Sequence, residues 1–143
     1  SIIGVEDIKL LVPFVKEEMN IFNAIDMIIE KKYYDGINII RRLQADGAAG
    51  SYIVSMLARQ VRMMLLFKDM HFRGVSEVQM NTRLGITSDW VMNKVKEQGR
   101  RYSQTDLALL HLGLLESDRA IKTGRITEDT VGEFLIEVFT GLP

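Results

Sequence analysis

The sequence predicts an all-α fold, a single compact bundle of about five to seven helices. Apolar residues recur at helical spacing along most of the chain, with one apolar stripe in each segment. No window shows the sustained alternation of apolar and polar residues that is typical of a strand. The chain has 143 residues, 47% of them hydrophobic and 26% charged, with only two prolines. That composition is typical of one ordinary globular domain.

The first segment reads differently from the rest of the chain. A short helix from Val5 to Leu11 is expected, and Pro13 interrupts any continuation. Because a domain rarely begins with so short an element followed by a break, we expect residues 1–18 to be the end of a preceding domain and a linker. The helical domain then covers residues 19–143.

Helical spacing is continuous from Asn20 onward. Asn20 is expected to be the N-cap of a helix that ends near Lys31 and Lys32. The apolar positions of that helix are Ile21, Phe22, Ile25, Ile28 and Ile29. A second helix, Tyr34 to Ala45, is stopped by Asp46 and Gly47.

The third predicted helix, Ser51 to about Phe72, is the longest and the least amphipathic. Apolar side chains, among them Met56, Met63 and Met64, occupy most of its circumference, so we expect it to be buried in the middle of the bundle. Two short helices follow, roughly Ser76 to Leu84 and Ser88 to Arg101, with Gly85 at the corner between them.

The best-defined predicted helix runs from Ser103 to Thr123. Ser103 and Asp106 form a variant of the capping box, and Lys122 followed by Gly124 is a typical helix stop. Its predicted core stripe consists of Leu107, Leu110, Leu114 and Ile121, broadened by Leu112 and Leu115. A last helix is expected from about Thr127 to Phe139.

Asp118 lies within this apolar stripe, where a carboxylate is unfavourable unless it is paired. The economical partner is Arg62, inside the long third helix, and we predict a structural ion pair between Arg62 and Asp118. Arg59, Arg100 and Arg101 are second choices for the same role.

The chain carries none of the common catalytic signatures, neither a phosphate-binding loop nor a metalloprotease or nucleophile motif. It has no cysteine and only two histidines, and these lie on different predicted helices without partners at metal spacing. We therefore expect a non-catalytic protein with no cofactor and no metal. Without a signal peptide or a long apolar run, the expected compartment is the cytoplasm and no membrane contact is predicted.

Residues 77–101 raise an alternative, a small helix-turn-helix protein that binds DNA. Met80, Leu84, Ile86 and Val91 fall where that motif wants apolar residues, and Gly85 falls at its turn. Lys94, Lys96, Arg100 and Arg101 would suit a DNA backbone. Two positions disagree, because Asn81 stands where alanine is usual and Lys94 where an apolar contact is needed. The net charge of −1 also argues against strong, sequence-independent binding to nucleic acid.

Several segments together resemble a known family, the C-terminal part of the delta subunit of bacterial DNA polymerase III, which belongs to the clamp loader. The matching residues are Gln60 and Arg62 in the long helix; Gln98, Arg100, Tyr102 and Ser103; and Asp118, Ile121, Lys122 and Gly124. The segment IFNAIDMII, residues 21–29, also fits, and the resemblance covers nearly all of residues 20–142.

The resemblance implies that residues 1–18 end the small lid domain and that residues 19–143 form the helical collar domain, through which loader subunits join in a ring. Its implied partners are the motor subunit and a delta-prime-like subunit. The sliding clamp would be reached only through an N-terminal domain that is not in this sequence, and any DNA contact would be indirect or weak.

An assembly module of this kind should carry interface residues on its surface. The candidates are aromatic residues at element ends, where full burial is least expected, together with three basic residues. The interface candidates are Tyr33, Tyr34, Phe72, Trp90, Arg100, Arg101 and Lys122.

Overall fold

Helix α3, Gly50–Phe72, is the element against which most of the other helices pack. The computed structural model describes residues 19–143, so the predicted helix from Val5 to Leu11, the break at Pro13 and the boundary at residue 18 lie outside the described residues. The all-α prediction is confirmed: residues 19–143 contain helices, turns and loops and no strand.

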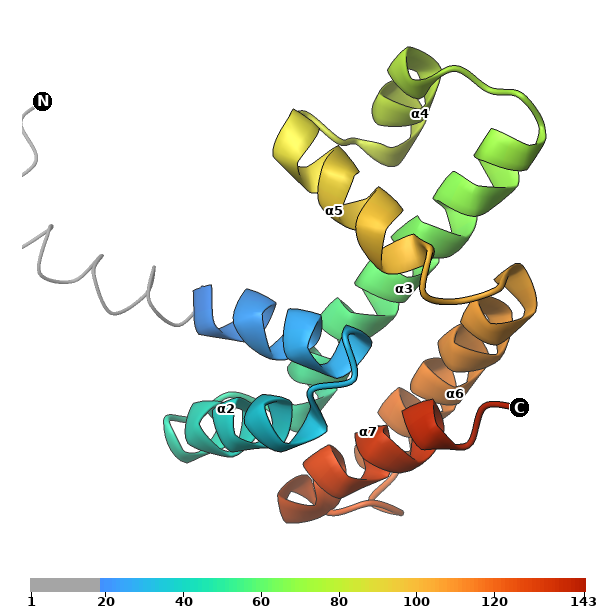
Figure 1. The fold of residues 1–143 in the computed structure, drawn as a ribbon. Helices are drawn as coiled ribbons and strands as arrows, with labels where there is room; N and C mark the ends of the chain where they lie inside the picture. Colours follow the sequence, from blue (N-terminus) through green and yellow to red (C-terminus); the bar gives the residue numbers. More distant parts are fainter. Residues whose placement is uncertain (1–18) are drawn as a thin grey trace, which may run out of the picture.

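The described helices follow the predicted order. A helix over residues 19–29 is followed by α2 (Tyr33–Ala45), α3, α4 (Glu77–Leu84), α5 (Asp89–Gly99), α6 (Gln104–Lys122), a 3-10 turn η1 (Glu128–Thr130) and α7 (Val131–Thr140). The expected last helix is thus divided, because its first turn is the tighter η1. Figure 1 shows α3 running through the fold, with α5 and α6 on it and α7 lying beside α6. No helix among residues 19–143 combines the length and the apolar character that crossing a membrane requires.

Local capping chemistry sets three of the helix starts. The hydroxyl oxygens of Ser76, Ser88 and Ser103 accept hydrogen bonds from the backbone N–H three residues later, at 3.3, 3.2 and 3.0 Å. Each serine is therefore the N-cap itself, and the helix begins one residue after it. The prediction that Asn20 is an N-cap is wrong, since residues 19 and 20 are already helical. Gly124 ends α6 with a positive φ of 77°, as expected of a glycine stop.

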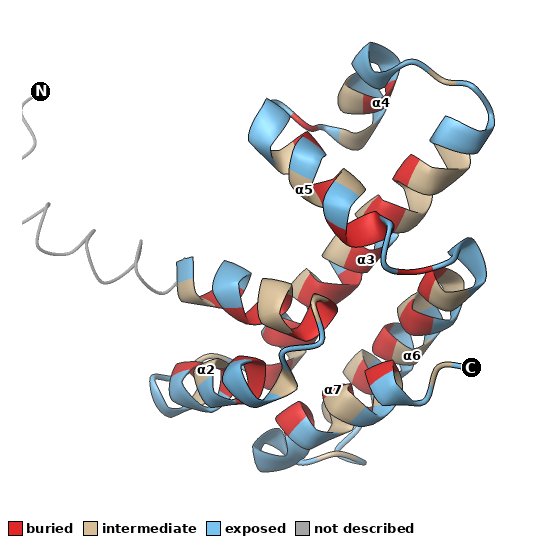
Figure 2. Cartoon of the chain, in the orientation of Figure 1, coloured by how far each residue is buried: buried red, intermediate tan, exposed pale blue. Residues whose placement is uncertain are grey.

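The core is one cluster centred on α3, and Figure 2 shows its buried residues along that helix in red. Helix α3 buries side chains on several sides, which confirms its predicted central position. Its most extensive partner is α6. The fully buried large side chains include Ile28, Ile29, Leu57, Met64, Leu107, Leu110, Leu114 and Leu135. Each contributes about 1.5–3 kcal/mol of transfer free energy.

The breadth of the apolar stripe on α6 was predicted wrongly. Leu112 is 63% exposed and Leu115 is 49% exposed, so neither widens the core. On the opposite edge of the stripe, two small residues, Gly113 and Ser117, pack closely against the rest of the protein. Gly113 lies so close to α7 that a Cβ there would approach Val138 to 2.9 Å. Ser117 is buried, and its hydroxyl donates to the carbonyl of Gly113 over 2.7 Å.

Candidate functional site

A groove of about 540 Å³ opens between helix 19–29, α3 and the start of α5, beside the corner at Gly85. Helix 19–29 and α5 both lie against α3 (Figure 1), and residues of these two helices form the walls of the groove. We call it the Trp90 groove and define it by six of its lining residues. These are Met19, Phe22, Met56, Arg59, Met63 and Trp90.

Large apolar side chains of the Trp90 groove remain in solvent. Trp90 is 70% exposed, Met19 is 60% exposed and Phe22 is 47% exposed. Met56 and Met63 reach the groove from α3 and are half-buried. Met64 is fully buried in the core, and Met56 and Met63 pack against the core while they also line the groove.

A polar network lies beneath these apolar walls. The Nε2 of the buried Gln98 donates to Oδ1 of Asp26 over 2.8 Å, and its Oε1 accepts from Nε2 of Gln60 over 2.9 Å. The second oxygen of Asp26 pairs with Nζ of Lys94 at 3.0 Å. Because these groups bond to one another, their side chains are held in fixed positions.

Lys94 joins the polar network to the aromatic wall. Its Nζ lies 4.8 Å from the ring centroid of Trp90 and 5.8 Å from that of Phe22, both within cation–π range. The ammonium is thus engaged by Asp26 and by two rings at once. This explains how a lysine occupies a position that a helix-turn-helix would reserve for an apolar residue, since its stem packs while its charge is satisfied.

Two of the three remaining basic residues of the helix-turn-helix alternative also have acidic neighbours. Lys96 forms an ion pair with Glu77 of α4, and Arg100 lies 3.5 Å from a carboxylate oxygen of Glu97. Met80 and Ile86 are buried and hold the α4–α5 corner against the core. The corner is therefore present, and two of the four basic residues, Lys94 and Lys96, are neutralised by carboxylates of other helices, whereas Arg100 and Arg101 are exposed.

A second cavity of about 580 Å³ lies on the other side of α5, where α3, α5 and the start of α6 meet. Both lysines that line this cavity already have partners within the protein. Nζ of Lys68 donates to the carbonyls of Gly99 and Tyr102, at 2.9 and 2.5 Å, and Lys96 is paired as described. Phe72, 84% exposed, lines this cavity.

The ion pair predicted between Arg62 and Asp118 is absent from residues 19–143. Asp118 pairs instead with Lys122 on its own helix, over 2.7 Å, while its other oxygen is buried without a hydrogen-bond partner. Arg62 lies on the exposed side of α3. The geometric reason is that Asp118 stands at the edge of the α6 stripe, where a residue one turn later reaches it more readily than a side chain of α3.

The predicted interface residues do not gather at one place. Trp90 lies in the Trp90 groove, Phe72 and Arg100 line the second cavity, and Tyr34 is 80% exposed on α2. Arg101 and Lys122 are exposed and Tyr33 is half-buried. Burial raises the pKa of Tyr33 above its usual range.

Sequence reasoning missed Phe22, which helical spacing assigned to the core, and Arg59, considered only as a partner for Asp118. It also missed the exposed leucines of α6, Leu109, Leu112 and Leu115, which are spaced three residues apart. Such spacing places them on one side of the helix, a signal that could have separated them from the core stripe.

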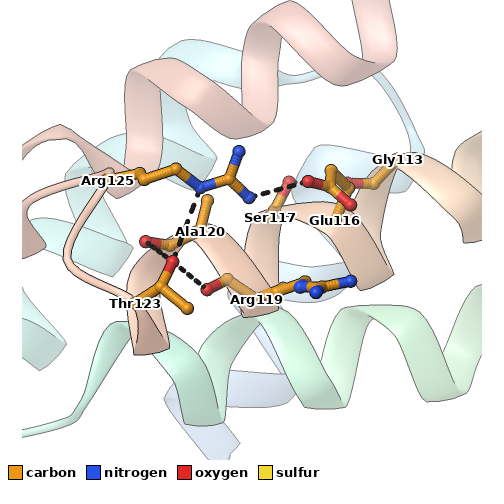
Figure 3. A network of polar contacts seen from close by, with 7 residues as sticks. All are labelled: Gly113, Glu116, Ser117, Arg119, Ala120, Thr123 and Arg125. Atoms are coloured by element: carbon orange, nitrogen blue, oxygen red, sulfur yellow. Dashed lines mark hydrogen bonds and ion pairs between the residues drawn. The ribbon is translucent and has the colours of Figure 1, made fainter.

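A polar cluster closes the C-terminal end of α6. Figure 3 shows Arg125 folded back toward that helix, where its guanidinium contacts Glu116 at 2.7 Å and Thr123 at 3.5 Å. The hydrogen bond and charge of Arg125 lower the pKa of Glu116. No group of three or more possible metal-binding side chains occurs in the described part of the chain, and His71 stacks on Phe67 with ring centroids 5.9 Å apart.

Three comparisons place the fold among known proteins. The family model of the DNA polymerase III delta subunit, C-terminal domain, matches residues 18–139. The DNA polymerase III subunit delta of Bacillus subtilis (strain 168) is 26% identical over 137 residues, which are 96% of this chain and 38% of that protein. The solved structure of a Bacillus subtilis DNA clamp loader delta protein shares the fold, with a TM-score of 0.72 at 24% identity over 87% of this chain and 37% of that one.

Proposed function

The chain belongs to the family formed by the C-terminal domains of DNA polymerase III delta subunits, and on that premise we propose that it is the helical collar module of a clamp loader. In this role it joins its own subunit to the sister subunits, the motor subunit and a delta-prime-like subunit, and is not itself catalytic. The observation that carries the proposal is the family match over residues 18–139, nearly the whole described fold. Under the same proposal residues 19–143 are the collar and residues 1–18 belong to the lid.

The surface supports an assembly role. Exposed large apolar side chains occur on several helices, including Tyr34 on α2, Trp90 on α5 and Leu112 on α6. Large exposed apolar patches commonly mark protein contacts. A domain in the interior of a ring needs two different contact faces, because its neighbours meet it head to tail.

The chain spans 38% of the length of the curated relative that it matches. We therefore assign assembly alone to this chain, and we propose that clamp binding and opening reside in parts of the subunit outside it. The helix-turn-helix alternative over residues 77–101 is not favoured, because Lys94 and Lys96 are paired with carboxylates inside the protein.

The test is a pull-down of the 143-residue chain with each purified loader subunit from the same organism, followed by size-exclusion chromatography of any complex. We expect a complex with at least one sister subunit and no mobility shift of duplex DNA at low salt. A salt-dependent shift of duplex DNA, without any complex between the chain and a sister protein, would instead support the DNA-binding alternative.

A further inference from the structure

We propose that the Trp90 groove receives an apolar segment of a sister loader subunit, and that a carboxylate on this segment pairs with Arg59. The inference rests on the proposed function, from which it takes the source of the segment. It goes further by assigning the contact to one groove and by specifying the chemistry of what enters it.

The apolar walls of the groove favour an apolar occupant. Trp90, Met19 and Phe22 expose between 47% and 70% of their surfaces around a single hollow of about 540 Å³. Tryptophan and arginine are the residues on which interface energy most often concentrates, and methionine adapts its shape to a partner. Covering these side chains would remove a large apolar area from water.

The charges of the groove specify a carboxylate on that occupant. Asp26 and Lys94 neutralise one another over 3.0 Å. Arg59 is exposed at the groove and has no ion-pair partner among residues 19–143. Among residues 19–143 the groove therefore presents one positive charge without a carboxylate partner, beside apolar walls. A carboxylate satisfies a guanidinium best, since the two can form parallel hydrogen bonds.

The floor of the groove favours a protein segment over a small molecule. Sites for small molecules usually aim several polar groups at the ligand. Here the lining residues Gln60 and Asp26 are both bonded to the buried Gln98 behind them, so these two stiffen the floor instead of pointing unpaired into the hollow. A stiff floor below an open apolar rim suits a partner side chain, because little ordering is needed on binding.

The second cavity offers no equivalent site. Lys68 is taken up by the carbonyls of Gly99 and Tyr102, and Lys96 by Glu77. Its exposed aromatic residue, Phe72, stands without a neighbouring exposed tryptophan or methionine in the lining. Within the described part of the chain, the Trp90 groove is the cavity that combines an apolar wall with a cation that has no carboxylate partner.

The experiment uses the 143-residue chain and each purified sister loader subunit as the probe. Trp90 is the single tryptophan of the chain, so its emission in a complex can be followed after the partner spectrum is subtracted. Affinity is measured by calorimetry for the wild type, Arg59→Glu, Arg59→Lys and Trp90→Ala. Arg42→Glu is the matched control, because Arg42 is an exposed arginine on α2 outside the groove.

We expect Trp90 emission to shift to shorter wavelength in the complex. Arg59→Glu and Trp90→Ala should each weaken binding roughly tenfold or more, as central interface residues do. Arg59→Lys should keep more affinity than Arg59→Glu, and Arg42→Glu should bind like the wild type. All four variants change exposed side chains, so thermal unfolding should confirm that each of them folds.

Three results would overturn the inference. If the wild type binds a sister subunit and Arg59→Glu and Trp90→Ala bind equally well, the groove is not the contact although the collar function stands. If the free chain already shows the emission of a buried indole, whether concentration-dependent or not, a second copy or the chain's own upstream residues cover the groove. If no sister subunit binds the wild type at all, the proposed function itself fails.

Discussion

Gln98 of α5 donates a hydrogen bond from Nε2 to Oδ1 of Asp26 in helix 19–29, over 2.8 Å. The same side chain accepts from Gln60 of α3 over 2.9 Å, so one amide joins three helices. Gln98 is only 2% exposed, and its donor and acceptor are both used. A buried amide satisfied at both ends restricts how the three helices can meet, because any shift would break a hydrogen bond that water cannot replace.

Replacing Gln98 by leucine should therefore destabilise the fold. Leucine has a similar volume, but the substitution leaves Gln60 and Asp26 without their buried partner, at a cost of about 1–3 kcal/mol. Urea unfolding of both proteins measures the difference. Gln79→Leu is the control, because Gln79 is exposed on α4, and it should change stability by less than about 0.5 kcal/mol. Equal stability of Gln98→Leu and wild type would show that the network is dispensable.

Gly85, at the corner between α4 and α5, should resist replacement by alanine for a backbone reason alone. Its φ is +69°, in the left-handed region, and a Cβ there would meet nothing within 4 Å. Gly85→Ala should lower the free energy of unfolding by about 1–2 kcal/mol. Gly85→Asn, which tolerates this conformation better, should lose less. If the two variants were equally stable in urea, the strain argument would not hold.

The starts of α4, α5 and α6 could be predicted from sequence because the chemistry that sets them is local. Ser76, Ser88 and Ser103 each bond to a backbone N–H only three residues away. A pattern within one turn carries that information completely. The central position of α3 could also be predicted from sequence, since a helix that is apolar on most sides has to be covered by other helices.

The contacts between helices could not be read in the same way. Whether Leu112 faces the core depends on where α7 packs, and Gly113, a small residue, marks that contact. The Trp90 groove draws Phe22, Met63 and Trp90 from three helices. No short window of sequence contains all three, so helical spacing alone assigns Phe22 to the core, and Trp90 can be proposed as an interface residue without its neighbours in the groove.

Leu110 and Leu112 give a direct test of the observed face of α6. Leu110 is fully buried, whereas Leu112 is 63% exposed. Leu110→Ala should destabilise the protein by about 2–5 kcal/mol, because it removes buried surface and leaves a cavity. Leu112→Ala should change stability by less than about 0.5 kcal/mol. Chemical denaturation of both variants is the measurement, and similar losses would mean that the stripe is as broad as its sequence suggested.

Tyr102 should make stability fall at alkaline pH. Burial raises the pKa of its hydroxyl, with the neighbouring Tyr33 adding to the effect. The hydroxyl also donates to the carbonyl of Ile29. Because the folded pKa lies above the unfolded value of about 10, the stabilisation is complete below that pH and is lost as pH rises toward the folded pKa.

Tyr102→Phe isolates this effect. At neutral pH the variant should be less stable by about 1–3 kcal/mol, since the carbonyl of Ile29 loses its donor. Above about pH 10 the wild type should lose stability faster than the variant, so the difference between them shrinks. Urea unfolding across the alkaline range measures both curves. A difference that stays constant with pH would show that Tyr102 ionises equally well in the two states.

Two double-mutant cycles measure which basic residue, Lys122 or Arg62, interacts with Asp118. Asp118 and Lys122 are paired at 2.7 Å one helical turn apart, and the acid precedes the base, the favourable order in a helix. Asp118→Asn with Lys122→Gln should show a coupling of about 0.2–0.5 kcal/mol, and added salt should reduce it because Lys122 is exposed. Asp118→Asn with Arg62→Gln should be additive, since Arg62 is exposed on α3 and pairs with no residue in the described part of the chain. Coupling in the second cycle and none in the first would mean that Asp118 bridges α6 to α3 in solution and that its buried oxygen, unpaired in the structure, is the atom that Arg62 reaches.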